Sequence, residues 1–377
     1  MSEETPRFGF GRNWSQFVKK AFCEERVEAS REKLLGFLRL PDLRGRTFLD
    51  IGCGSGLHSL AALRAGAARV VSFDYDPQSV ATARFLWERE GRPAVWEIGR
   101  GSVLDAGYMR SLPPSDIVYS WGVLHHTGDV WTALRNAALP LAAEGLFFIA
   151  LYSHDIQLDP PAQFWLDVKQ RYNRQGLLGR RLLELWYFWR FIYLPDRRAG
   201  VSTRKRFREY YKSRGMSQWT DIRDWLGGWP MEFVKIMEVQ DFLDRELGLE
   251  LLDMTSNEAN AEYLCRRKGA RIWDDVLRQR ETVELSRPFV HVDRHCYRAA
   301  LPPAWAALAD SDAAPRRSPL FLQEDARRLQ IPHGAHWLIA DKGLGRYSHR
   351  EEGVLFASSD NSDPNTNGRT YRATVGG

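Results

Sequence analysis

Several features that would fix the class of this 377-residue protein are missing from its sequence. Its four cysteines, Cys23, Cys53, Cys265 and Cys296, are far apart and form no C-x-x-C pair, which excludes a disulfide framework and a zinc knuckle as first interpretations. No run of about 18 apolar residues occurs, and the N-terminus lacks a basic stretch followed by an apolar one. We therefore expect no transmembrane segment and a cytoplasmic location.

Apolar residues are plentiful, and the charge is unevenly distributed. Apolar residues make up 44% of the chain and aromatic residues 12%, enough for a sizeable core. Residues 169–214 contain 14 Lys or Arg against three acids, a charge of +11 in a chain whose total is +5. An anionic partner is therefore most expected at this stretch.

Short apolar runs alternate with helical spacing through the first half of the chain. This pattern predicts a parallel sheet with helices on both faces, an α/β doubly wound fold. The segments "LELLDMTS" and "AEYLCRRK" add two more strands and make the sheet seven-stranded. The first five strands are expected at 47–51, 69–74, 94–98, 115–120 and 145–152, and the helices near 57–65, 77–90, 104–111 and 129–142.

Changes in composition and in the pattern of apolar residues divide the chain into three parts. Residues 1–40 form an N-terminal segment with a helix at about 14–39, and residues 41–268 contain the sheet. A Trp- and Arg-rich helical insertion, residues 155–238, follows the fifth strand. Residues 270–377 read as a small β-rich appendix, with "HVDRHCYRAAL", "HWLIADKG" and "EGVLFASSD" as short strands.

The segment "FLDIGCGSGLHSL", residues 48–60, places glycines at every second position after a strand. Such a turn lets the backbone approach a ligand at the carboxyl edge of a parallel sheet. The dinucleotide fingerprint G-x-G-x-x-G does not fit, because position 57 is Leu. An acid at Asp50 suits the cationic ammonium and sulfonium groups of S-adenosylmethionine better than a pyrophosphate.

The next three strand ends also carry polar residues. Asp74 ends the second strand, 24 residues after Asp50, where a carboxylate is placed to accept ribose hydroxyls. "GSVLD" follows the third strand and "VYSWGVLHHTGD" the fourth. Through "LDIGCGSG", "VVSFDYDP" and "DIVYSWGVLHHTGD", the sequence over about residues 45–268 resembles the class I S-adenosylmethionine-dependent methyltransferases.

The resemblance implies which positions contact the cofactor. Two departures from the family pattern are Ser102, where many members have Asp, and "AAEGL" in place of a Pro-Gly-Gly turn. No metal is expected. The implied contacts are Asp50, Gly52, Gly54 and Gly56 for the methionine end, Asp74 for the ribose, Tyr75, Ser102 and Val103 for the adenine, and Ser120 for the amino group.

Methyl transfer to a hydroxyl requires an aligned nucleophile and a base to remove its proton. His125 and His126 follow the fourth strand, and His154 follows the fifth. We prefer His126 because the adjoining helix start would fix its orientation, and the alternative is that these histidines only cap or pack.

Two stretches of the insertion suggest further contacts. We interpret "LLELWYFWRFIYL", residues 182–194, as a buried lid helix, with an interfacial helix near a lipid-linked substrate and nucleic-acid binding as alternatives. "YYKSRGMSQWTDIRDWLGGWP" resembles a segment of bacterial methyltransferases encoded with sugar and secondary-metabolite pathways. It would line a polar substrate cavity with Tyr210, Tyr211, Arg214, Trp219 and Asp221.

The appendix carries weaker signals. Residues 345–371 resemble a segment at the ends of bacterial proteins for surface-polysaccharide biosynthesis. The loop "SDNSDPNTNG" is interpreted as a structured turn rather than a Ca²⁺ or sugar site. His291, Asp293 and His295 share a face of one expected strand, where a zinc site is the less favoured alternative to plain histidines.

We therefore expect an enzyme that uses S-adenosylmethionine to methylate a hydroxyl on a small substrate. The substrate would contain sugar or be a secondary-metabolite or polysaccharide precursor, and the appendix would recognise it or mediate a homodimer. One alternative is a tRNA-modifying methyltransferase that uses the basic stretch 169–214. The other is a catalytically silent cofactor-binding partner protein.

Overall fold

The fold was analysed in a computed structural model, which describes residues 24–214, 218–256, 259–311, 313–314 and 317–376. Within these ranges no helix is long and apolar enough to cross a membrane.

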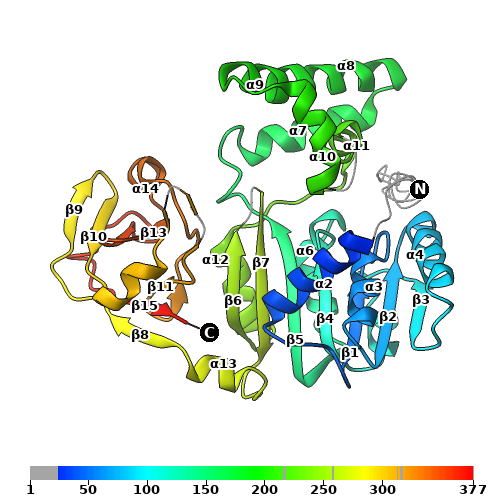
Figure 1. The fold of residues 1–377 in the computed structure, drawn as a ribbon, viewed down its shortest axis with the longest axis horizontal. Coiled ribbons are helices and arrows are strands. Elements are labelled where there is room, and N and C mark those ends of the chain that lie inside the picture. The colour runs from blue at the N-terminus through cyan, green and yellow to red at the C-terminus, as the bar shows by residue number, and fades with distance from the viewer. Residues whose placement is uncertain (1–23, 215–217, 257–258, 312, 315–316, 377) are drawn as a thin grey trace.

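A seven-stranded sheet forms the centre of the larger part of the molecule (Figure 1). Its order is β3-β2-β1-β4-β5-β7-β6, and β7 runs antiparallel to both of its neighbours. The strands are β1 (Thr47–Ile51), β2 (Arg69–Asp74), β3 (Trp96–Arg100), β4 (Ser115–Trp121), β5 (Leu141–Tyr152), β6 (Leu249–Ser256) and β7 (Asn260–Arg267). The expected doubly wound, seven-stranded sheet is confirmed.

Helices cover both faces of the sheet because its strands alternate apolar side chains on two sides. Leu49 and Phe147 belong to one buried cluster, and Phe48 and Phe148 belong to the other. The first cluster includes α5 (Ala106–Ser111), α6 (Val130–Ala137), α12 (Ile236–Asp241) and the π-helix η3 (Phe242–Glu246). The second includes α2 (Glu24–Leu38), α3 (Leu57–Arg64) and α4 (Pro77–Arg89).

Element boundaries differ from the sequence predictions at a few places. The third strand begins at Trp96 rather than at residue 94, and the helix expected over 129–142 ends at Ala137. Pro140 cannot continue a helix, and β5 begins directly after it. Of the expected helix 14–39, residues 24–38 form α2, and residues 14–23 lie outside the described ranges.

The helical insertion stands at the carboxyl ends of the parallel strands, where β5 ends (Figure 1). Aromatic side chains hold it together, among them Trp165, Tyr187 and Phe191. The interpretation of residues 182–194 as a buried helix is wrong on one side, because Leu182, Leu185 and Trp189 are exposed. The helices are α7 (Ala162–Arg174), α8 (Leu177–Tyr187), the π-helix η2 (Phe188–Tyr193), α9 (Leu194–Arg198), α10 (Thr203–Arg214) and α11 (Gln218–Gly227).

The C-terminal segment, residues 270–377, contains two four-stranded antiparallel sheets with orders β13-β14-β10-β9 and β12-β11-β15-β8. Its own core includes Leu322, Tyr347, Phe356 and Tyr371. The strands are β8 (Glu281–Glu284), β9 (Val290–Asp293), β10 (Cys296–Ala299), β11 (Phe321–Glu324), β12 (Arg327–Arg328), β13 (Tyr347–Arg350), β14 (Gly353–Phe356) and β15 (Tyr371–Val375); the helices are α13 (Asp274–Arg278), the 3-10 helix η4 (Pro303–Leu308) and α14 (His336–Lys342).

Two expectations for this segment are corrected. "HWLIADKG" is the helix α14, which buries Ile339 and Ala340 and ends at Gly343 in a positive-φ conformation. β9 ends at Asp293 and the chain turns at Arg294, so His295 does not share a strand face with His291. His291 Nε2 lies 2.9 Å from the carbonyl oxygen of Arg294, and the described residues contain no cluster of three or more His, Cys, Asp or Glu side chains suited to a metal.

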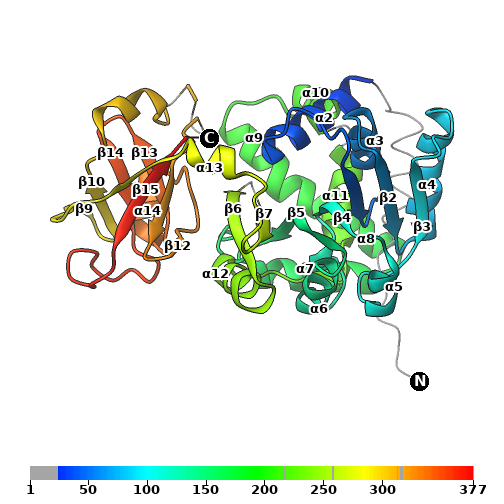
Figure 2. The ribbon, with the colours of Figure 1, turned by 90° about the horizontal axis from the view of Figure 1, so that it is seen from below.

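The C-terminal segment lies against the β6 edge of the sheet, as Figures 1 and 2 both show. Arg328 is buried there, and its guanidinium donates to the Leu252 carbonyl and, over 3.1 Å, to Asp253 Oδ1. Arg346 donates to the carbonyl oxygen of Asp155, where the helical insertion begins. These contacts tie the C-terminal segment to the edge of the sheet and to the base of the insertion.

Candidate cofactor and acceptor site

The glycine turn between β1 and α3 depends on glycine for its conformation and for its packing. Gly52, Gly54 and Gly56 have φ angles of 71°, 53° and 79°. A Cβ atom on Gly52 would lie 2.3 Å from a methyl group of Val123, and one on Gly56 would lie 2.9 Å from Cβ of Ala83. The turn is therefore built by the protein's own packing, and its positive φ angles expose backbone at the strand end.

Asp50 lies at the start of this turn, almost fully buried, at one end of a chain of hydrogen bonds. The Ser59 hydroxyl donates to Asp50 Oδ2 over 2.5 Å, and the Ser72 hydroxyl donates to that of Ser59 over 2.7 Å. Trp96 Nε1 donates to the Ser72 hydroxyl over 2.9 Å. Burial raises the pKa of Asp50 to about 7, so a nearby cation would favour its ionised form.

Asp74 joins the ends of the first two strands. The backbone N–H of Gly54 donates to its Oδ2 over 2.9 Å, and that of Asp76 donates to its Oδ1 over 2.8 Å. Each carboxylate oxygen has a second lone pair, so these bonds leave Asp74 able to accept from a ligand. Burial raises the pKa of Asp74 despite these bonds. Asp50 and Asp74, which are separated in the sequence, thus lie at the same edge of the sheet and make that edge acidic.

The other implied cofactor positions differ in what their side chains can do. Tyr75 is half-exposed, and the Arg100 guanidinium carbon lies 5.8 Å from the centroid of the Tyr75 ring. The Ser102 hydroxyl accepts from the backbone N–H of Leu104. Val103 and Ser120 are buried, and the Ser120 hydroxyl donates to the Ile51 carbonyl over 3.1 Å. Any cofactor contact by Val103 or Ser120 would therefore involve backbone atoms.

The three candidate bases lie in different environments. His125 and His126 end the short 3-10 helix η1 (Leu124–His126), and their ring centroids are 4.5 Å apart. His126 Nδ1 lies 2.8 Å from the Pro230 carbonyl oxygen, and burial lowers its pKa to about 4. His125 is fully buried, with neither ring nitrogen hydrogen-bonded to a described residue. His154 is exposed beside Phe233.

A buried group of side chains, which sequence reasoning missed, connects His125 to the helical insertion. Tyr152 lies 4.5 Å from the His125 ring and 5.7 Å from the Trp225 ring, between centroids. Lys169 donates to the Trp225 carbonyl, and its Nζ lies 4.2 Å from the Trp225 ring centroid. Burial lowers the pKa of Lys169 to about 7. Only helical spacing on α7 distinguishes Lys169 in the sequence, so its burial was not predictable.

Two indole nitrogens of this group lack partners. Among the described residues, nothing accepts a hydrogen bond from Trp165 Nε1 or Trp225 Nε1, although both atoms are buried. Buried donors of this kind are rare and call for a ligand or water. We name Lys169, Trp165, Trp225, Tyr152 and His125 the insertion cluster.

Three of the five residues expected to line a polar cavity make contacts within the insertion. The Tyr210 hydroxyl donates to Asp221 Oδ2 over 2.7 Å, and Trp219 packs between Phe188 and Phe207. The side chains of Tyr211 and Arg214 lie outside the described part of the chain. Tyr210 and Asp221 thus use their polar groups on each other.

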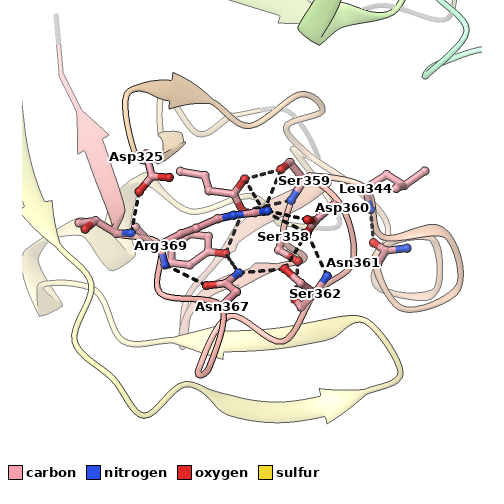
Figure 3. A network of polar contacts seen from close by, with 12 residues as sticks. Asp325, Leu344, Ser358, Ser359, Asp360, Asn361, Ser362, Asn367 and Arg369 are labelled. Carbon is pink, nitrogen blue, oxygen red and sulfur yellow. Dashed lines mark hydrogen bonds and ion pairs between the residues drawn. The ribbon is translucent and has the colours of Figure 1, made fainter.

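The Asx-rich loop of the C-terminal segment is closed by Arg369 (Figure 3). Its guanidinium pairs with Glu324 and Asp360, and this pairing holds the pKa of Asp360 below its usual range. The Tyr371 hydroxyl donates to Glu324 Oε1 over 2.8 Å and accepts from Asn367. The loop is a structured turn in which Asp360 is paired with Arg369 and Asp363 Oδ1 accepts from the backbone N–H of Asn365 over 2.9 Å.

The fold and this strand edge together define a class. A doubly wound sheet with a positive-φ glycine turn and acids at its first two strand ends is the arrangement of class I S-adenosylmethionine-dependent methyltransferases. Residues 49–149 match the family model described as a methyltransferase domain. This part of the chain is thus a methyltransferase domain, and S-adenosylmethionine is the methyl donor of its class.

Curated relatives share shorter stretches. The chain is 52% identical over 50 residues to the ribosomal protein L11 methyltransferase of Aeromonas hydrophila, which is 13% of this chain and 17% of that protein. It is 29% identical over 128 residues to the protein of the same name from Vibrio cholerae, 32% of this chain and 43% of that protein. The chain thus spans less than half the length of these relatives.

Solved structures show a similar arrangement at low identity. An O-methyltransferase family protein from Burkholderia thailandensis has 14% identity and a TM-score of 0.42, over 68% of this chain and 58% of that chain. Magnesium protoporphyrin IX methyltransferase from Synechocystis, with bound SAH, has 13% identity and a TM-score of 0.40, over 68% and 93%. Because these TM-scores are below 0.5, the strand order carries the fold assignment.

Proposed function

We propose that this protein transfers a methyl group from S-adenosylmethionine to a hydroxyl of a small, sugar-containing acceptor. The observation that carries the proposal is the nearly buried Asp50 carboxyl beside a glycine turn, with a pKa raised to about 7. A buried acid at this strand edge gains most from a cationic ligand. The sugar-containing character of the acceptor is supported by the sequence resemblances of residues 210–230 and 345–371.

The cofactor would lie along the acidic strand edge. Asp50 and the turn Gly52–Gly56 would hold its methionine end, and Asp74 would accept from the ribose hydroxyls. Tyr75, Ser102 and Val103 would border the adenine, and Ser120 would face the amino group through its backbone. When bound, S-adenosylmethionine supplies an electrophilic methyl group on a sulfonium.

His126 is the base in this proposal. The Pro230 carbonyl can only accept a hydrogen bond, so Nδ1 carries the proton and Nε2 carries the lone pair. Because burial keeps the imidazole neutral near pH 7, Nε2 is in the form that accepts the hydroxyl proton as the new O–C bond forms. His125 and His154 remain the rival bases, and among the described residues no carbonyl oxygen fixes the tautomer of either ring in this way.

The insertion cluster is the proposed acceptor contact. It adjoins His126 through the His125 ring, and its two indole N–H groups lack partners among the described residues. Indole donors and a Lys169 ammonium bind oxygen atoms, which suits an acceptor rich in hydroxyl or other oxygen groups. Methylation would turn one acceptor hydroxyl into an ether, whose oxygen still accepts a hydrogen bond from these donors but no longer donates one.

Two measurements test the function separately. Isothermal calorimetry with S-adenosylmethionine and its demethylated product tests the cofactor site; we expect binding by the native protein and at least about tenfold weaker binding by Asp50→Asn. Mass spectrometry of candidate glycosides then tests for the gain of one methyl group. Binding without any methylated glycoside would refute the sugar-containing acceptor, and no heat with either nucleoside would refute the function.

A further inference from the structure

The outer side of helix α8 presents a row of exposed apolar side chains. Leu178, Leu182, Leu185 and Trp189 are spaced by four, three and four residues, so they lie on one helical face. Their exposed fractions are 83%, 68%, 54% and 54%. Leu178, Leu182 and Leu185 are on α8 and Trp189 is on η2, which continues it; we name these four residues the outer face of α8.

The opposite side of α8 fixes the helix in this orientation. Glu184 is buried; it accepts from the Tyr172 hydroxyl over 2.9 Å and from the guanidinium groups of Arg181 and Arg223. Ile192, one turn beyond, is also buried in the insertion. Because the inner side is fully used, rotation of the helix cannot hide the outer face.

Exposed arginines precede and follow the outer face in the chain, on α7, η2 and α9. Arg174, Arg190, Arg197 and Arg198 are exposed and form no ion pair with a described residue. Of the acids in residues 169–214, Glu184 and Asp196 are buried and paired with arginines. Figure 1 shows α8 and α9 as the part of the insertion farthest from the sheet. An accessible apolar row therefore lies at the outer end of the molecule, with exposed arginines before and after it in the chain.

From this pattern we propose that α8 and α9 dock on the surface of a bilayer that contains anionic phospholipid. The leucines and Trp189 would enter the boundary between headgroups and acyl chains, and the arginines would contact the lipid phosphates. A second copy of this chain is disfavoured as the partner, because it would bring the same exposed arginines against these. Nucleic acid would satisfy the arginines and leave the leucines in water, since base stacking uses aromatic rings.

Vesicle binding by the full chain tests the proposal. We expect co-sedimentation with vesicles of phosphatidylglycerol and phosphatidylcholine, with clearly weaker binding to phosphatidylcholine alone and in high salt. Leu182→Gln with Leu185→Gln should lower the partition coefficient at least about tenfold. Arg197→Gln with Arg198→Gln should lower it roughly fivefold per charge on the anionic vesicles only.

The matched control is a second exposed tryptophan. Trp337 on α14 is 65% exposed and lies in the C-terminal segment, so Trp337→Gln should bind as the native protein does, whereas Trp189→Gln should bind more weakly. Circular dichroism verifies that each variant is folded. If the leucine variant does not fold, the arginine variant alone tests the vesicle binding.

Three results would overturn the proposal. The first is that the native protein binds both kinds of vesicle equally and that the leucine variant binds them as well as the native protein does. The second is a dimer in sedimentation equilibrium that the leucine variant dissociates, with no vesicle binding by the native protein. The third is binding of a tRNA mixture that depends on the arginines and not on the leucines, again without vesicle binding. Cofactor binding is measured in a separate experiment. Failure of the membrane proposal can therefore be distinguished from failure of the proposed methyltransferase function.

Discussion

His126 Nδ1 lies 2.8 Å from the carbonyl oxygen of Pro230, although 104 residues separate the two in the sequence. This bond joins the end of β4 to the chain that leaves the helical insertion. It sets the imidazole tautomer, and thereby places the lone pair that the proposed reaction needs on Nε2.

His126→Ala should lower kcat with little effect on the dissociation constant for S-adenosylmethionine. Loss of a general base costs about 10²–10⁴ in rate. Turnover on an identified acceptor and calorimetry with the cofactor separate the two effects. His154→Ala is the control, because His154 is exposed, and a larger loss in that variant would move the base to the end of β5.

The affinity for S-adenosylmethionine should depend on pH through Asp50. Its pKa of about 7 in the ligand-free protein means that the carboxyl is mostly neutral at pH 6 and mostly ionised at pH 8. Binding of the cation should therefore strengthen roughly tenfold between these values. In Asp50→Asn the binding should be weaker and nearly independent of pH, as calorimetry at three pH values would reveal. A native profile as flat as that of the variant contradicts the assignment.

The buried Lys169 should make stability rise with pH. Its pKa is lowered to about 7 in the folded protein, while an unfolded lysine titrates near 10.4. Between these values the unfolded chain binds more protons, so the free energy of unfolding increases as the pH rises. Lys169→Met should reduce this increase. Urea unfolding at pH 7, 8 and 9 measures it, and an identical slope in both proteins would contradict the burial of the ammonium.

Gly52→Ala should destabilise the protein much more than Gly91→Ala. Both glycines have positive φ, so both variants lose about 1–2 kcal/mol from the backbone alone. A Cβ on Gly52 also meets Val123 at 2.3 Å, whereas one on Gly91 meets nothing within 4 Å. Thermal unfolding of the two variants isolates this clash, and adding Val123→Ala to Gly52→Ala should recover part of the loss. Equal effects of the two single substitutions would show that packing plays no part.

Local sequence was sufficient for the sheet and for the acidic strand edge. Period-two and period-3.6 patterns located the first five strands and the helices between them, because the period of the apolar residues reports which face of an element is buried. Asp50 and Asp74 were found because they lie at the carboxyl ends of their strands, and parallel strands end at one edge. The helix expected over 129–142 was predicted too long because Pro140 was overlooked.

Contacts between distant segments were beyond the sequence. Ser59, Ser72 and Trp96 reach Asp50 from three elements, and nothing in their own surroundings distinguishes them from ordinary core residues. The same holds for Lys169, which the fold buries against Trp225. The orientation of α8 was wrongly predicted because its apolar residues occur on both sides, and sequence does not tell which side meets the protein.

The sequence by itself thus determined a doubly wound sheet with a glycine turn and two acids at its carboxyl edge, since these follow from hydrophobic periodicity and strand direction. Only the tertiary structure decided which histidine has its tautomer fixed, which lysine loses its water, and which side of α8 stays in solvent. Those outcomes depend on burial and on partners far away in the chain, and folding alone brings such groups together.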